Sequence, residues 1–227
     1  MTHLLAKQAR KTALAVFSLT LFLCAAAAFS AKPSGPEILT QAREMIRAQD
    51  ISITGKLRTG PNNVPFQLDQ SGGVSTYTFR DPEETVTVNL GESSVKLSGV
   101  AKGAGASLIR GSVLSYDDLA LRFLYWKRVE DLGQEKLRSL PCWKLRLDAP
   151  DKSSPYAFVK LWVNEQSGAF IRAQAFDWKG VLAKQFDVIS TQKIGGRYFL
   201  KQMKIQLMQS TAKDAPTLSY LEIDKPR

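Results

Sequence analysis

The alternation of apolar and polar side chains with a period of two, interrupted by short turns, most constrains how this chain can fold. Between Cys142 and Asp148, the side chains of Trp143, Leu145 and Leu147 share one face and polar side chains share the other. This pattern is typical of an antiparallel strand that buries one face. We expect further strands at residues 159–163, 170–176, 181–191, 199–207 and 218–223, with shorter ones at 51–58, 64–70, 76–79, 85–90 and 95–98.

Two helices are expected beside these strands. The first covers residues 36–48, because Pro36 and Glu37 are favoured in a first helical turn and apolar residues follow at helical spacing. The second begins at Ser115, whose hydroxyl precedes Asp118 by three residues in a near capping box, and it continues to about Trp126.

A meander of about ten or eleven strands must curl in order to bury one face. Two helices cannot fill a closed barrel of that size, but they fit in the concavity of a half-open one. The predicted fold is therefore mainly β (α+β), a curled half-open antiparallel β-barrel of about 10–11 strands with helices in the concave face. Such a fold leaves an apolar groove between sheet and helices, where a lipid chain or a hydrophobic segment could lodge.

Residues 1–30 have the pattern of a secretory signal peptide. Lys7, Arg10 and Lys11 precede an uncharged apolar run, and Ala28 and Ser30 suit the last positions before cleavage, so that the mature chain begins with residue 31. A retained membrane anchor is the alternative, because about 17 uncharged residues approach the lower limit for a spanning helix. We predict that residues 31–227 form a single exported domain.

The histidine and cysteine content excludes most nucleophilic and zinc chemistry. The sole histidine, His3, lies in the predicted signal peptide, and the cysteines are Cys24 and Cys142. Catalytic Ser-His-Asp and Cys-His sites and His-containing zinc sites are thus excluded from the mature chain, and two cysteines build no disulfide framework. Lipidation of Cys24 is a minor alternative, since Leu23 stands where a lipobox needs a small residue.

Motifs for catalysis and cofactor binding are also absent from the sequence. The glycine-rich residues 99–106 lack the Gly-Lys-Ser/Thr ending of a phosphate-binding loop and are interpreted as a linker. Asp117 and Asp118 are adjacent, so on a helix they point in different directions and stabilise the helix start. We predict that the protein is not an enzyme and binds no cofactor or metal.

The chain is basic, with a formal net charge of +10. In an exported protein this surplus favours anionic lipid, cell-wall polymer or an acidic protein surface as a partner, and we expect no nucleic-acid binding. The alternative is that the surplus serves only solubility.

Candidate ligand-contacting side chains are aromatic and aliphatic residues expected to line the groove. The candidates are Trp126, Trp143, Trp162, Phe199, Met203, Ile205 and Leu207. A place in the core is the alternative for each tryptophan, since most aromatic residues of a sheet protein are core residues. Lys201 falls on the same predicted face as Phe199, so the lining is not purely apolar, and Trp178 is expected to be exposed in a turn.

Five short segments carry a likeness to a known family. They are residues 111–119 (GSVLSYDDL), 140–147 (LPCWKLRL), 156–163 (YAFVKLWV), 171–180 (IRAQAFDWKG) and 218–224. The order of these segments resembles that of the outer-membrane lipoprotein-sorting proteins of the LolA-like group, whose relatives include LolB and RseB. The likeness spans most of residues 49–224. The resemblance implies a half-barrel whose concave face binds acyl chains, acting in the periplasm as a carrier or sensor. No residue here matches a lipid-gating position of the carrier itself.

Two hypotheses follow for function. The first is a non-enzymatic periplasmic binding protein for lipid acyl chains or lipoproteins, with an implied role in outer-membrane lipoprotein sorting and with a membrane-bound transporter or acceptor protein as a further partner. Burial of a chain of about 16 carbons could supply on the order of 10 kcal/mol before ordering costs. The alternative is a periplasmic sensor or adaptor of the same fold that binds a protein partner. Membrane association is expected if the N-terminal segment is retained.

Overall fold

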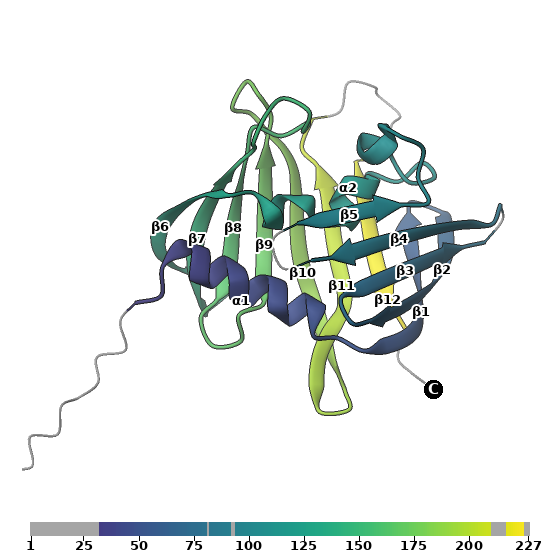
Figure 1. Ribbon diagram of the computed structural model, residues 1–227, viewed down its shortest axis with the longest axis horizontal. Helices are drawn as coiled ribbons and strands as arrows, with labels where there is room; N and C mark the ends of the chain where they lie inside the picture. The colour runs from purple at the N-terminus through teal and green to yellow at the C-terminus, as the bar shows by residue number, and fades with distance from the viewer. Residues whose placement is uncertain (1–31, 81, 92–93, 210–216, 225–227) are drawn as a thin grey trace, which may run out of the picture. The chain divides into compact units, whose positions relative to one another are not determined.

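The computed structural model describes residues 32–80, 82–91, 94–209 and 217–224 (Figure 1). The chain divides into two compact units, Met1–Lys32 and Pro33–Arg227. The predicted signal peptide, residues 1–30, lies outside the described residues. None of the helices in the described part is long and apolar enough to cross a membrane.

In the second unit, twelve antiparallel strands form one sheet within the described ranges. The strands are β1 (Ile51–Thr59), β2 (Asn62–Ser71), β3 (Val74–Phe79), β4 (Glu84–Leu90), β5 (Val95–Ser98), β6 (Arg128–Leu137), β7 (Leu140–Asp148), β8 (Phe158–Asn164), β9 (Phe170–Phe176), β10 (Leu182–Ile194), β11 (Arg197–Leu207) and β12 (Leu218–Ile223). Their order in the sheet is β5-β4-β3-β2-β1-β12-β11-β10-β9-β8-β7-β6.

The first and last strands are neighbours at the middle of this sheet. Leu57 of β1 pairs with Leu221 of β12, so two meanders meet at this seam. The outer strands β5 and β6 are the two edges. In Figure 1, β6 to β9 run steeply across the direction of β2 to β5, which shows how strongly the sheet curls. The predicted half-open curled barrel is confirmed.

The first helix forms where the sequence predicts it. Helix α1 covers Gly35–Arg47, and the backbone N–H of Ser34 donates to Glu37 Oε2 at 2.7 Å. This bond and the Ser34 hydroxyl lower the pKa of the Glu37 carboxyl. The buried residues Ile38, Leu39 and Ala42 share one side of the helix and join the core. An apolar stripe therefore decides how α1 packs.

The second predicted helix is much shorter than expected. After the cap at Ser115, α2 covers only Tyr116–Leu119, and a separate 3₁₀ turn, η2, covers Arg122–Tyr125. The break is at Leu121, whose φ of 46° is left-handed and cannot continue a helix. The N–H of Leu121 donates instead to the carbonyl of Asp118 at 3.0 Å, which closes the end of α2. A continuous helix from 115 to 126 was therefore a wrong prediction, although its start was right.

Strand β6 is not predicted by the sequence pattern. Its residues carry charges instead of an alternating apolar set, and most of its side chains are exposed. It is an edge strand, and Gly133, with φ of 91°, lies where the pairing with β7 shifts register between Asp131 and Gln134. Charges and bulges are usual at sheet edges, because they discourage pairing with another chain.

One face of the sheet forms the main core. On β7, Leu145 and Leu147 are fully buried, as the alternation predicts. The core also contains residues of α1 and of the segment 99–127, which we call the inner segment and which includes η1 (Ala104–Ala106), α2 and η2. A second, small cluster consists of Leu137, Cys142 and Trp162, with Ile171 packed against it.

Candidate functional site

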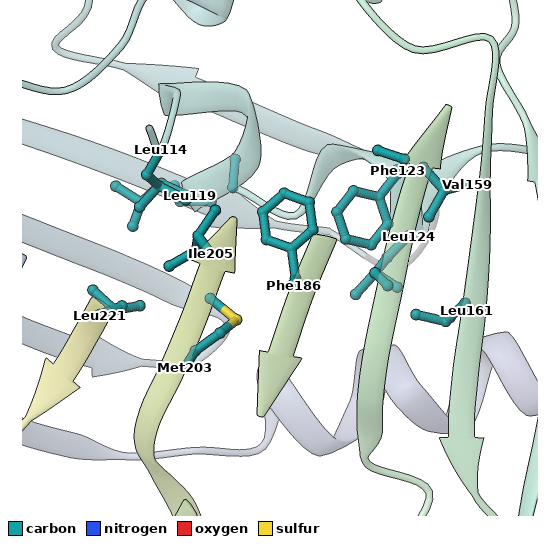
Figure 2. Close-up of a cluster of buried hydrophobic side chains, with 14 of the residues drawn as sticks. Leu114, Leu119, Phe123, Leu124, Val159, Leu161, Phe186, Met203, Ile205 and Leu221 are labelled. Atoms are coloured by element: carbon teal, nitrogen blue, oxygen red, sulfur yellow. The ribbon is translucent and has the colours of Figure 1, made fainter. Parts of the chain in front are cut away.

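The inner segment connects the two edge strands and packs against the inner face of the sheet. Its contributions to the main core are Ile109, Val113, Leu114, Tyr116, Leu119, Ala120, Phe123, Leu124, Tyr125 and Trp126. Figure 2 shows Phe123 beside Phe186 of β10, and their ring centroids are 5.9 Å apart. Side chains of the inner segment thus occupy the concave face where the sequence predicts a groove.

A buried ion pair joins the inner segment to β10. Lys184 Nζ lies 2.6 Å from Asp118 Oδ2, and the side chains are 6% and 1% exposed. Asp118 also accepts hydrogen bonds from the backbone N–H of Ser115 and from the hydroxyl of Tyr156, each at 3.0 Å. Because an uncompensated buried charge is costly, these partners hold α2 against the sheet.

The Tyr156 hydroxyl is held in its protonated form. Burial raises the pKa of Tyr156 well above its ordinary value of 10.0, and the Asp118 carboxylate raises this pKa further. Since ionisation would set two negative charges side by side, Tyr156 remains a donor to Asp118 at neutral pH.

A second attachment joins the inner segment to α1. Arg43 Nε donates to the carbonyl of Leu124 at 2.6 Å, and its guanidinium lies 5.1 Å from the ring centre of Tyr125. Burial lowers the pKa of Arg43 and raises the pKa of Tyr125. A charged donor to a backbone carbonyl is a strong hydrogen bond, so η2 is fixed to α1.

Two further attachments reach β12, which forms the seam with β1, and β4, which lies beyond the seam. The N–H of Val113 donates to Ser219 Oγ at 3.0 Å on β12. Glu84 of β4 accepts from the Tyr116 hydroxyl and lies 3.4 Å from Arg110. Burial and the bond to Glu84 raise the pKa of Tyr116 to about 12. Three strands, β4, β10 and β12, and helix α1 thus hold the inner segment through separate polar contacts.

The structure separates the predicted ligand-contacting residues into three groups. Trp126, Trp143, Met203 and Ile205 lie in the main core, and Leu207 packs against it. Trp162 lies in the second cluster, and Phe199 is buried outside both clusters. Lys201 is exposed at a register shift between the pairs Ser190–Gln202 and Thr191–Leu200.

The polar residues that attach the inner segment were not identified from the sequence. The sequence pattern predicts Asp118 only as a helix-start charge and assigns no role to Arg43, Tyr156 or Lys184. One signal was present, because Lys184 stands two residues before Phe186 on an alternating strand and therefore shares its apolar face. A lysine at such a position needs a buried partner.

The described residues offer no cluster of three or more His, Cys, Asp or Glu side chains that could hold a metal ion. Burial raises the pKa of the Cys142 thiol, which disfavours its reactive thiolate form. The arrangement gathers apolar side chains on the inner face of the sheet, with polar groups that fix the cover in place.

A protein-family model described as "Uncharacterized protein" matches residues 96–226. No curated protein shows a significant match to the chain.

Solved structures share the fold at low sequence identity. A putative outer membrane lipoprotein-sorting protein domain from Vibrio parahaemolyticus has a TM-score of 0.62 at 14% identity, over 84% of this chain and 90% of that one. A LolA superfamily protein from Nitrosomonas europaea has a TM-score of 0.61 at 18% identity, over 86% and 93%. A DUF1329 family protein from Desulfovibrio piger has a TM-score of 0.58 at 17% identity, over 84% and 90%.

Proposed function

Because the chain belongs to the family whose model matches residues 96–226 and has the fold of LolA superfamily proteins, we propose that it binds lipid acyl chains or lipoproteins in the periplasm. Binding is non-enzymatic and uses the inner face of the sheet. The role that this suggests is carriage of acylated cargo during outer-membrane lipoprotein sorting.

The observation that carries this proposal is the composition of the cover over the inner face. The cover is one segment of the chain with apolar side chains and separate polar attachments, instead of a second sheet with a continuous hydrogen-bonded ladder. An acyl chain could take the place of part of this cover, since it offers the same apolar contact. At about 0.8 kcal/mol per methylene, the chain has enough transfer free energy to offset local opening.

Opening has identifiable structural requirements. Phe123 must leave the ring of Phe186, and the Arg43 bond to Leu124 must break or lengthen. The Asp118–Lys184 pair must either move together with α2 or become hydrated. Ligand affinity should therefore rise when an attachment is weakened without loss of the fold.

The test is to export the protein with its own N-terminus, purify it from the periplasm and record its mass under native and denaturing conditions. A lipid-sized adduct that is lost on denaturation, together with saturable binding of a fluorescent fatty acid, is the expected result. If the protein carries no adduct and does not bind the fatty acid, the proposal is contradicted. That result would favour the alternative, a sensor that binds a protein partner.

A matched pair of arginine variants sharpens this test. Arg43→Gln removes an attachment of the inner segment, so it should raise fatty-acid affinity. The control is Arg58→Gln, on the opposite face of the sheet. Arg58 pairs with Glu222 at 2.7 Å and lies over the ring of Tyr220. This control variant should leave fatty-acid affinity unchanged.

A further inference from the structure

The outer face of β7, β8 and β9 carries cations stacked on aromatic rings. Arg146 lies 4.0 Å from the ring centre of Phe158, Lys144 lies 4.9 Å from that of Trp162, and Lys160 lies 5.1 Å from that of Phe176. We call these six residues the outer strip. The rings of Phe158 and Phe176 are themselves stacked at 4.5 Å.

Strand register places the outer strip on one continuous surface. Lys144 pairs with Trp162, Arg146 with Lys160, and Phe158 with Phe176. Leu145 lies between Lys144 and Arg146 on β7, and Leu161 lies between Lys160 and Trp162 on β8. Both leucines are fully buried in the main core. Since successive side chains of a strand point to opposite faces, the outer strip faces away from the inner segment.

The cations of the outer strip are only partly neutralised. Lys144 pairs with Glu135 at 2.7 Å, and Arg146 pairs with Asp148 at 2.8 Å. No carboxylate in the described ranges forms an ion pair with Lys160. A ring beneath each cation holds it in place without neutralising it, so the surface stays attractive to anions.

Beyond the outer strip, the turn between β9 and β10 exposes apolar side chains. Trp178 and Val181 are both 44% exposed, which confirms the predicted exposure of Trp178. Trp178 Nε1 donates to the Ser154 carbonyl at 2.9 Å, and Lys152 lies 5.9 Å from its ring centre. We call Lys152, Trp178 and Val181 the tip.

Two carboxylates near the tip are engaged by their own turns. Asp177 accepts the backbone N–H groups of Lys179 and Val181 at 2.9 Å each. Asp151 accepts the N–H of Ser153 at 2.7 Å. These bonds stabilise the turns, so the negative charges have local donors. The Ser153 hydroxyl and then its backbone N–H lower the pKa of Asp151.

We propose that the outer strip and the tip form a docking surface for an anionic phospholipid bilayer. Cations on a sheet surface match the phosphates of a headgroup layer, and an exposed tryptophan beside an apolar side chain suits the interface beneath them. This surface lies on the face opposite to the proposed acyl-chain site. The protein can therefore contact a membrane while its inner face remains covered or loaded.

The experiment measures co-sedimentation of the full chain, recovered after export, with vesicles of phosphatidylcholine alone or mixed with phosphatidylglycerol. The strip variant combines Lys144→Gln, Arg146→Gln and Lys160→Gln. The matched control combines Lys96→Gln, Lys193→Gln and Lys201→Gln, which removes the same charge from exposed residues elsewhere.

We expect the wild type to bind the anionic vesicles more tightly than the neutral ones, and to lose affinity as salt is raised. The strip variant should bind anionic vesicles about tenfold more weakly, while the control changes affinity by less than about twofold. Trp178→Ala should also weaken this binding, by about threefold.

Equal losses in the strip and control variants would overturn the proposal, because net charge alone would then explain binding. Equal affinity for neutral and anionic vesicles would also overturn it. Thermal unfolding monitors folding of each variant, and Lys160→Gln alone, at the cation without a carboxylate partner, provides a milder substitution. Fatty-acid binding should be unchanged in the strip variant, which separates this test from that of the acyl-chain site.

Discussion

Asp118 and Lys184 meet 2.6 Å apart although 66 residues separate them in the chain. One belongs to α2 in the inner segment and the other to β10 on the inner face of the sheet. Their contact is therefore a long-range bond between the cover of the concave face and the sheet beneath it.

Asp118→Asn should destabilise the protein by about 3–5 kcal/mol, because it leaves the buried ammonium of Lys184 without its counter-ion. Urea unfolding measures this loss. Asp117→Asn is the matched control at the adjacent residue, whose carboxylate pairs with the half-exposed Arg122 at 2.8 Å, and it should cost less than about 1 kcal/mol. If both variants lose the same free energy, the buried pair does not hold α2.

Stability should fall at alkaline pH as tyrosines ionise in the unfolded chain. Burial raises the pKa of Tyr77 to about 12, and the pKa of Tyr116 is also about 12, from an ordinary value of 10.0. Between pH 10 and pH 12 the folded state retains protons that the unfolded state has lost. The contribution of these tyrosines to the free energy of unfolding is therefore fully present below about pH 10 and decreases above it. The loss should be about 1 kcal/mol per tyrosine near pH 11.

Denaturant unfolding across this range, with tyrosinate absorbance as a second readout, checks the alkaline prediction. Tyr77→Phe should make the decline less steep, and Tyr198→Phe is the matched substitution of an exposed tyrosine. A decline that is identical in wild type and Tyr77→Phe would contradict it.

Phe186→Ala should cost about 3–5 kcal/mol, since a fully buried ring beside Phe123 is replaced by a cavity. Phe158→Ala on the outer face removes a half-buried ring and should cost about 1–2 kcal/mol. Chemical denaturation compares the two. Equal costs would show that the inner face is no better packed than the outer one.

Gly55→Ala should weaken the seam between β1 and β12. An added Cβ would lie 2.5 Å from the Glu222 carbonyl oxygen and 2.6 Å from Phe66 Cζ, so the backbone or the ring must move. We expect a loss of about 2 kcal/mol or more in thermal unfolding. Gly60→Ala is the control, because its Cβ meets nothing within 4 Å and it tests only the cost of a positive φ of 55°, about 1 kcal/mol. A smaller loss for Gly55→Ala than for Gly60→Ala would refute the steric explanation.

The strands that bury one face could be predicted from the sequence, and the largely exposed edge strand β6 could not. Leu145 and Leu147 alternate with polar residues because one face of β7 is in the core. Strand β6 pairs with one strand only, β7, and most of its side chains are exposed, so its sequence carries no periodic signal. Leu121 ends α2 by a backbone angle that its residue type does not reveal.

The sequence predicted which residues face the inside of the sheet, but not the polar contacts that hold the inner segment there. Aliphatic periodicity identified Met203 and Ile205 on the inner face. The pairing of Asp118 with Lys184 depends on how the inner segment crosses that face, which local sequence does not encode. Trp162 was predicted to line the groove but lies in the second cluster, because aromatic character alone does not tell which face of a strand is the inner one.

The inner segment is joined at its two ends to β5 and β6, the two edges of the sheet. It therefore cannot dissociate as a separate body in the opening that the proposed function requires. Return of the segment is a first-order process with a high effective concentration, independent of how much protein is present. A molecule on the inner face would thus compete with a segment of the same chain, and closure of that segment would lower the molecule's apparent affinity by the free energy that opening costs.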